Sequence, residues 1–288
     1  MRKTDKPWKS GKQRKKRQVC AALLMAALVS LTGCGRAKDD LTITNVSYDP
    51  TREFYEKYNE LFESYYQDTY GETVNVIQSH GGSGAQARSV VEGCNADVVT
   101  LALEHDITLI ERTGLIDEGW INEFDRDSAP YTSTIVFLVR AGNPKQIEDW
   151  DDLTAEGVDV ITPDPKSSGG ACWNYLAALA YAKTHDDTEG QQMDFLRKLY
   201  ANVSVMDSGA RGSTTTFVEN GKGDVLIAWE NEALTTLDSY PGEYELIYPS
   251  VSILAQPSVA IVDDNAGANG TEQLSREYLQ YLYSDEAQ

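Results

Sequence analysis

The sequence predicts an α/β fold with two lobes, each a mostly parallel sheet flanked by helices, joined by two extended crossings. Two observations predict this fold. Strand and helix patterns alternate over residues 41–112 and again over 158–248, the order that gives a parallel sheet covered on both faces. Two long extended runs, 131–140 and 252–262, flank the second set. We therefore expect a hinged molecule with a cleft between its lobes.

The first predicted strand, LTITNVSY (41–48), stops at Asp49-Pro50. Asp is a common helix cap and Pro suits the first helical position, so we expect a helix here with Asp49 as its cap. Its apolar side chains recur at helical spacing and should pack on the sheet; they are Phe54, Tyr58, Leu61, Phe62 and Tyr65.

The remaining elements follow from the same patterns. In lobe 1 we expect strands over 73–78 and 96–103, and helices over Ala85–Glu92 and about 106–112. In lobe 2 we expect helices between strands over 158–163, 224–230 and 244–249. We assign residues 41–130 and 258–288 to lobe 1 and residues 131–257 to lobe 2.

Residues 1–33 resemble an export signal, with the basic run GKQRKKRQ before the apolar CAALLMAALVSLTGC. About a dozen apolar residues are too few to span a bilayer, which needs roughly 20. The ending Leu-Thr-Gly-Cys34 resembles a lipobox, so we expect Cys34 to carry lipid, followed by a tether over 34–40. The protein would then be anchored by its lipid to the outer face of the cytoplasmic membrane. An ordinary signal peptide with an incidental cysteine is the alternative.

The charge balance excludes several partners. The chain has a formal net charge of −20, which becomes −28 without residues 1–33, because these hold nine of the 25 Lys and Arg and one of the 45 Asp and Glu. Such an acidic surface disfavours nucleic acid and anionic lipid headgroups and does not attract anions over long range. Any anion site must therefore act at short range.

The cysteines and histidines do not indicate a metal site. Cys94 and Cys172 remain when Cys20 leaves with the signal and Cys34 is lipidated. They could form a disulfide or be two buried thiols, since no framework spacing is visible. None of the three histidines has metal-ligand spacing to them. We expect no metal and no cofactor.

Four predicted helices begin with residue types that suit anions. Gly lets an oxyanion approach the backbone, Ser adds a neutral donor, and the first helical turn has free N–H groups and about half a positive charge. The starts are Asp49 before PTREFYEKYNE, HGGSG before AQARSVVE, SSGG before ACWNYLAALAYA, and SGAR before GSTTTFVEN. Any one alone would be an ordinary cap. All four follow strands, at the ends where open α/β sheets bind ligands.

These blocks also carry a family resemblance. NVSYDPTREFYEKYN, QSHGGSGAQAR, SAPYTSTIVFLVRAGNPKQIEDWDDL, VITPDPKSSGGACWNYLAA and DSGARGSTTTFVENGKGDVLIAWENEA look like the sulfate-binding proteins that serve ABC importers, over essentially residues 41–288. The resemblance implies the type II periplasmic-binding-protein fold, with sulfate buried in the cleft and delivered to ABC permease subunits. We expect a monomer.

In that family uncharged donors alone hold a dehydrated sulfate. Carried over by motif, the resemblance assigns this role to the backbone N–H of Asp49 and Ala210, the indole N–H of Trp229, and donors of Ser83, Ser168, Gly169 and Gly170. Sulfate at neutral pH has no proton to give, so a lining of donors suits it. A phosphate site would want an Asp that accepts a proton, and Asp49 or Asp207 leaves that alternative open. Thiosulfate and molybdate are further alternatives.

The chain departs from the family pattern at two places. Cys172 stands where the family usually has Arg, so the charge near the cleft rim differs. Family members also continue beyond the block that matches Gln288, with helices that pack on the lobes, so we expect that the C-terminal part of lobe 1 is missing here.

The same loops do not indicate an enzyme. HGGSG is similar to an oxyanion loop, and Ser83 or Ser168 could be a hydrolase nucleophile, but the G-x-S-x-G elbow fails because residue 85 is Ala. Neither Gly-rich loop ends in Gly-Lys-Ser/Thr, so a P-loop is excluded. We predict a binding protein rather than a catalyst.

Overall fold

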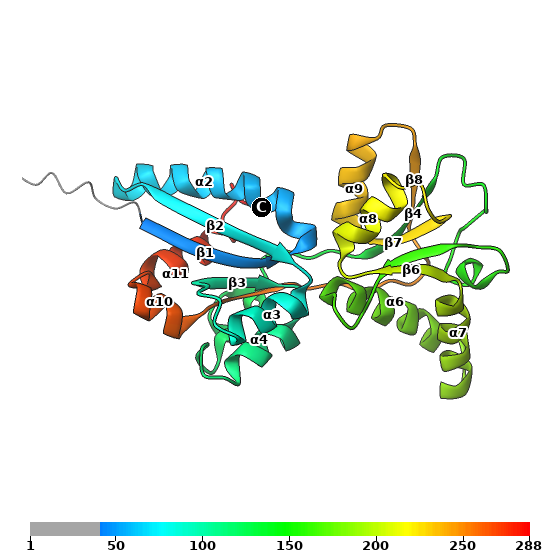
Figure 1. Cartoon of the computed structure of the whole chain (residues 1–288), viewed down its shortest axis with the longest axis horizontal. Coiled ribbons are helices and arrows are strands. Elements are labelled where there is room, and N and C mark those ends of the chain that lie inside the picture. Colours follow the sequence, from blue (N-terminus) through cyan, green and yellow to red (C-terminus); the bar gives the residue numbers. More distant parts are fainter. Residues whose placement is uncertain (1–40) are drawn as a thin grey trace, which may run out of the picture. The chain divides into compact units, whose positions relative to one another are not determined.

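The computed structural model describes residues 41–288. The predicted export signal, the predicted lipidation site Cys34 and the predicted tether lie outside these described residues. Between residues 41 and 288, no helix has both the length and the apolar character needed to cross a membrane. The described chain contains two sheets, each with its own helices (Figure 1), and we refer to them as lobe 1 and lobe 2.

Lobe 1 contains a four-stranded sheet with the order β2-β1-β3-β9. Strands β1, β2 and β3 run parallel, and β9 is antiparallel to β3. The strands are β1 (Leu41–Tyr48), β2 (Val74–Gly81), β3 (Val98–Leu101) and β9 (Ser258–Ile261). The helices are η1 (Asp49–Thr51), α2 (Arg52–Tyr70), α3 (Ser83–Val91), α4 (Glu104–Glu111), η2 (Trp120–Asn122), α5 (Asp125–Ser128), α10 (Asp263–Asn269) and α11 (Glu272–Tyr281).

Helices cover both faces of this sheet because alternate strand residues point to opposite sides. In β1, Ile43 packs in one apolar cluster with α2 and α11, and Val46 packs in another with α3 and α4. The buried face of α2 is aromatic and polar: Tyr55, Tyr58, Asn59, Phe62 and Tyr66. The prediction for Leu61 was wrong, since its side chain is 37% exposed. Each helical residue turns by about 100°, which carries Leu61 off the face of its neighbour Phe62.

Lobe 2 contains a five-stranded mixed sheet with the order β6-β5-β7-β4-β8. Strand β5 is parallel to β6 and β7, and β4 is antiparallel to β7 and β8. The strands are β4 (Ile135–Arg140), β5 (Val160–Pro163), β6 (Val203–Asp207), β7 (Val225–Trp229) and β8 (Tyr244–Ile247). The helices are η3 (Asp152–Thr154), α6 (Gly169–His185), α7 (Glu189–Ala201), α8 (Ala210–Val218) and α9 (Glu230–Ser239).

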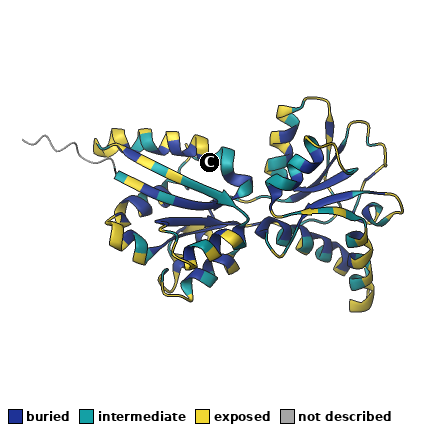
Figure 2. Ribbon diagram, in the orientation of Figure 1, coloured by how far each residue is buried: buried dark blue, intermediate teal, exposed yellow. Residues whose placement is uncertain are grey.

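The core of lobe 2 also has two sides. One apolar cluster joins the sheet to α6 and α7, and the other joins it to α8 and α9; the central strands are buried along their length (Figure 2). Edge strand β6 was not predicted, because its residues alternate between exposed and half-buried and form no apolar run. The α/β fold with two sheets is confirmed.

The two extended crossings lie side by side. Ser133 and Ala255 each donate a backbone N–H to the other's carbonyl, at 3.0 and 2.8 Å. In the first crossing, 131–140, only residues Ile135–Arg140 form a strand; this is β4, which belongs to the sheet of lobe 2. The chain therefore passes between the lobes through a short paired segment, a geometry that suits a hinge.

Candidate anion site

Four helix starts follow the carboxyl ends of strands. η1 follows β1, α3 follows β2, α6 follows β5 and α8 follows β6. Their first residues are Asp49, Ser83, Gly169 and Ala210. A first-turn N–H has no acceptor inside its own helix and points out of the helix start, so these starts supply backbone donors. α3 begins at Ser83, two residues before the predicted start.

A small cavity lies where these starts meet. It is a narrow gap with no room for a water molecule in this conformation, and it is lined by Tyr48, Asp49, Pro50, Gly81, Gly82, Ser83, Ser168, Gly170 and Ala210. Five of the seven predicted site residues are therefore in its lining, and Gly169 and Trp229 are not. None of these described lining residues is Lys, Arg or His. The lining residues come from both lobes, and Asp49 is the one acidic residue among them.

Glycine allows the lobes to touch at this point. A Cβ on Gly169 would lie 2.8 Å from the Cβ of Ser83 and 2.9 Å from that of Ala102, across the boundary between the lobes. A Cβ on Gly82 would lie 2.5 Å from the carbonyl oxygen of Ser167. Real side chains do not tolerate such separations, so the Gly-rich loops are needed for this close approach.

The hydroxyls of the two site serines are used differently. Ser168 caps α6, where its Oγ accepts from the Ala171 N–H at 3.3 Å, and no acceptor among the described residues takes its proton. Ser83 Oγ accepts from the Ala102 N–H at 3.0 Å and donates to Asp106 Oδ2 at 2.5 Å. Ser168 thus keeps a free hydroxyl donor, whereas the single proton of Ser83 is already in use.

Trp229 is buried at the end of β7, and its indole N–H donates to the carbonyl oxygen of Gly170 at 3.1 Å. The ring also contacts Tyr48, with ring centroids 5.5 Å apart. The indole therefore lies directly behind the Gly170 backbone that lines the cavity. Its donor is directed at the backbone rather than into the cavity.

The Asp49 side chain does not cap the helix that it begins, so that prediction was wrong. Its carboxylate instead lies 3.8 Å from the guanidinium of Arg52 and against the backbone of Gly209. Burial raises the pKa of Asp49, and the charges of Arg52 and Arg211 oppose this rise. Asp207 does not line the cavity, and its Oδ2 is buried without a hydrogen bond.

Two functional candidates were missed by the sequence reading, Asp106 and Trp173. Asp106 is 6% exposed, and it is linked to the site by the hydrogen bond that it accepts from Ser83. Trp173 donates its indole N–H to the Ala102 carbonyl at 2.8 Å, which joins α6 of lobe 2 to lobe 1. Both are ordinary residues of a helix start in the sequence, and only their long-range partners distinguish them.

Cys94 and Cys172 are free thiols, and so do not form the disulfide that the sequence left open. Cys172 Sγ donates to the Pro165 carbonyl at 3.2 Å. Burial raises the pKa of this thiol, and the charges of Asp106 and Asp164 raise it further. Among residues 41–288, no group of three or more His, Cys, Asp or Glu side chains could hold a metal ion.

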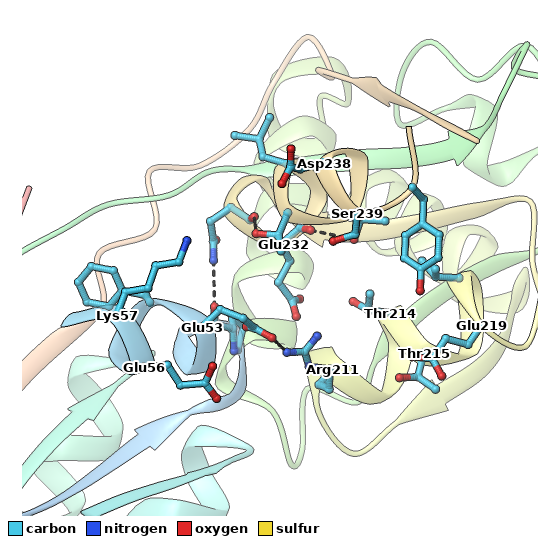
Figure 3. A pocket seen from close by; sticks show the side chains of 18 residues that line it. Glu53, Glu56, Lys57, Arg211, Thr214, Thr215, Glu219, Glu232, Asp238 and Ser239 are labelled. Carbon is cyan, nitrogen blue, oxygen red and sulfur yellow. Dashed lines mark hydrogen bonds and ion pairs between the residues drawn. The ribbon is translucent and has the colours of Figure 1, made fainter. Parts of the chain in front are cut away.

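A wide groove lies beside the cavity, between the start of α2 and helices α8 and α9 (Figure 3). Its volume is about 720 Å³. Glu53 of α2 and Arg211 of α8 form an ion pair across it, and Asn231 donates to the Pro50 carbonyl at 3.1 Å. Burial raises the pKa of Glu232, on the α9 side of the groove, to about 7, with Arg211 opposing and Asp49 adding to the rise.

Known proteins resemble this chain along most of its length. The family model described as bacterial extracellular solute-binding protein matches residues 43–288. A sulfate-binding protein of Escherichia coli K12 is 57% identical over 251 residues, which cover 86% of this chain and 76% of that protein. A thiosulfate-binding protein of Pseudomonas aeruginosa is 42% identical over 274 residues, covering 94% and 82%. The solved structure of the sulfate-binding protein SubI from Mycobacterium tuberculosis H37Rv has a TM-score of 0.75 at 31% identity, covering 86% and 83%.

Proposed function

Because the chain belongs to the family of bacterial extracellular solute-binding proteins, we propose that it captures sulfate between its two lobes and delivers it to an ABC permease. Relatives named as sulfate-binding proteins support the choice of ligand. The chain is a binding protein and not an enzyme. Its mutations should therefore change an affinity rather than a turnover number.

One observation at the site supports a buried dianion as the ligand. The described residues that line the small cavity include no basic side chain, yet they contribute the starts of four helices. Fixed N–H and O–H dipoles can hold a buried dianion at short range, and they carry no net charge that would attract anions from a distance. This arrangement fits a chain whose formal net charge is −20.

We assign the donors as follows. Backbone N–H groups of Asp49, Ser83, Gly169, Gly170 and Ala210 would point at the anion, together with the free hydroxyl proton of Ser168. In this assignment the Trp229 indole N–H would donate to the anion instead of to the Gly170 carbonyl, which is its acceptor in this structure. Ser83 would use its backbone because its hydroxyl proton is bound to Asp106.

We propose that binding is coupled to closure of the lobes. Lobe 1, residues 41–130 with 258–288, and lobe 2, residues 131–257, would rotate about the paired crossings at Ser133 and Ala255. The closed form would present both lobes to the permease. A lipid on Cys34 would hold the monomeric protein at the outer face of the cytoplasmic membrane, within reach of that permease.

Thiosulfate is the second candidate, and a thiosulfate-binding relative at 42% identity supports it. Its terminal sulfur replaces one oxygen of sulfate, so the same donors would serve both anions. Phosphate would need an acceptor for its proton, and of the two aspartates considered only Asp49 is in the cavity lining. Molybdate is a larger dianion that would use the same donors.

Calorimetric titration of the purified full-length chain tests the proposal. Sulfate, thiosulfate, phosphate and molybdate are titrated at pH 7 and again near pH 5. We expect sulfate or thiosulfate to bind tightly at both pH values and phosphate to bind far more weakly. Preferential binding of phosphate would assign the proton-accepting role to Asp49 and reject the donor-only site. Absence of binding by all four anions would reject the proposed function.

A further inference from the structure

A chain of hydrogen bonds lies directly beneath the candidate anion site. The Ala102 N–H, just after β3, donates to Ser83 Oγ at the start of α3, and Ser83 Oγ–H donates to Asp106 in the first turn of α4. Three elements of lobe 1 are thus tied together at one hydroxyl. A serine hydroxyl has a single proton, so this one cannot also be donated to an anion while Asp106 accepts it.

Asp106 is buried, and none of the described residues forms an ion pair with it. Among the described residues its side chain accepts one hydrogen bond, from Ser83. Burial raises the pKa of Asp106, whereas the hydrogen bond from Ser83 and the electrostatic interactions with His105 and Arg88 lower it. Burying a carboxylate costs folding free energy. Its position beside the candidate anion site therefore suggests a role in binding.

Ser83, which donates to Asp106, belongs to the surface that lobe 2 contacts. Gly169, the first residue of α6, packs against Ser83 and Ala102 so closely that a Cβ on it would lie 3.1 Å from Ser83 Oγ. One turn further along α6, Trp173 donates to the Ala102 carbonyl at 2.8 Å. The position of Ser83 and Ala102 therefore determines where α6 can approach the cavity.

We propose that Asp106 is a positioning residue for anion binding. By accepting the only hydroxyl proton of Ser83, it fixes Ser83 and Ala102 as the surface that receives α6, and it leaves the Ser83 backbone N–H as that residue's donor to the anion. The inference rests on the proposed function, since it concerns the same site. Asp106 acts through Ser83 and does not itself touch the ligand.

Substitutions at Asp106 and Ser83 test this role through the dissociation constant for sulfate. Asp106→Ala removes the acceptor, and we expect binding to weaken by about tenfold, the loss typical of one hydrogen bond to a charged group. Asp106→Asn keeps an amide oxygen that can accept from Ser83, so its affinity should stay within about twofold of the parent chain. Glu104→Ala is the matched control, because Glu104 is another first-turn acid of α4 but is exposed.

A double substitution shows whether the two residues act as one unit. Ser83→Ala should weaken binding as much as Asp106→Ala does, and the double variant should be no weaker than either single variant. If the Ser83 hydroxyl instead donated to the anion, Asp106→Ala would free its proton and tighten binding, which would overturn the inference. Additive losses in the double variant would overturn it as well.

The outcomes remain separable from those of the proposed function. If the parent chain binds none of the four anions, the proposed function fails. If the parent binds sulfate and the Asp106 and Ser83 variants bind it equally well, only the positioning role fails. Should Asp106→Ala not fold, a tenfold loss in Asp106→Asn or an unchanged affinity in Ser83→Ala would still reject the role of Asp106.

Discussion

Trp173 of α6 donates its indole N–H to the backbone carbonyl of Ala102, 2.8 Å away, and this hydrogen bond crosses from lobe 2 to lobe 1. It lies beside the glycine contact at Gly169 and next to the start of α6 that lines the cavity. Contacts between the lobes exist only when the lobes are together. Their energy should therefore contribute to anion affinity through closure, even though they do not touch the anion.

Trp173→Phe should weaken sulfate binding by about fivefold, since the aromatic ring remains and one hydrogen bond worth about 1 kcal/mol is lost. Trp150→Phe is the matched control, because Trp150 donates its indole N–H to the Val251 carbonyl within lobe 2. The control should lower the free energy of unfolding and leave the sulfate affinity unchanged. Equal affinities for the parent chain and Trp173→Phe in calorimetry would mean that this bond does not contribute to closure.

Gly169→Ala should weaken sulfate binding by about tenfold or more. The added methyl would lie 2.8 Å from the Cβ of Ser83, so the lobes could not close fully, and such overpacking typically costs about 1–3 kcal/mol. Gly190→Ala, at the corresponding end of α7, meets nothing closer than 4.0 Å and should not change the affinity. Undiminished binding by Gly169→Ala would show that the anion-bound form does not use this close contact.

Ser168→Ala removes both a helix cap and a proposed anion donor. Thr188→Ala separates the two effects, because Thr188 caps α7 in the same way, accepting from the Gln191 N–H at 3.3 Å. Both variants should lose about 1 kcal/mol of folding stability. Only Ser168→Ala should also lose about 1–3 kcal/mol of sulfate binding energy. Calorimetry and chemical denaturation measure the two quantities, and an unchanged dissociation constant would remove Ser168 from the site.

The ion pair between Glu53 and Arg211 should contribute little to closure. Both side chains are about two-fifths exposed, and exposed ion pairs are worth roughly 0–1 kcal/mol and are screened by salt. Glu53→Gln should weaken sulfate binding by less than about fivefold at low ionic strength, and this difference should vanish at about 0.5 M salt. Glu56 is a neighbouring groove carboxylate (Figure 3), and no described residue forms an ion pair with it, so Glu56→Gln should behave like the parent chain. A large, salt-independent loss in Glu53→Gln would contradict this expectation.

Glu232 should make folding stability depend on pH. Its pKa rises from 4.5 to about 7 on folding, mainly because the half-buried side chain has a desolvated carboxyl group, so the folded state holds this proton more tightly than the unfolded state. The resulting stability is complete below about pH 4.5 and is lost as pH rises through 7. Glu232→Gln should abolish this part of the decline in chemical denaturation at several pH values. An identical pH profile in the variant would exclude Glu232 as its source.

Sequence patterns predicted the fold and the helix starts because both depend on neighbouring residues. The strand ending at Tyr48, the Gly-rich start of α3 and the Ser-Gly start of α6 were all predicted from local composition, and the structure places them together. Two local predictions failed for geometric reasons. Leu61 turns away from the buried face of α2, and the Asp49 side chain faces Arg52 instead of the helix that it begins.

The sequence by itself determined the order of strands and helices, the Ser- and Gly-rich helix starts, and the strongly acidic charge. Only the tertiary structure decided which acceptors take the protons of the site. Ser83 donates to a carboxylate 23 residues away and Trp229 to a carbonyl 59 residues away. Such partners meet only after the sheets and helices have packed, because hydrogen-bond donors select acceptors by position and direction in space.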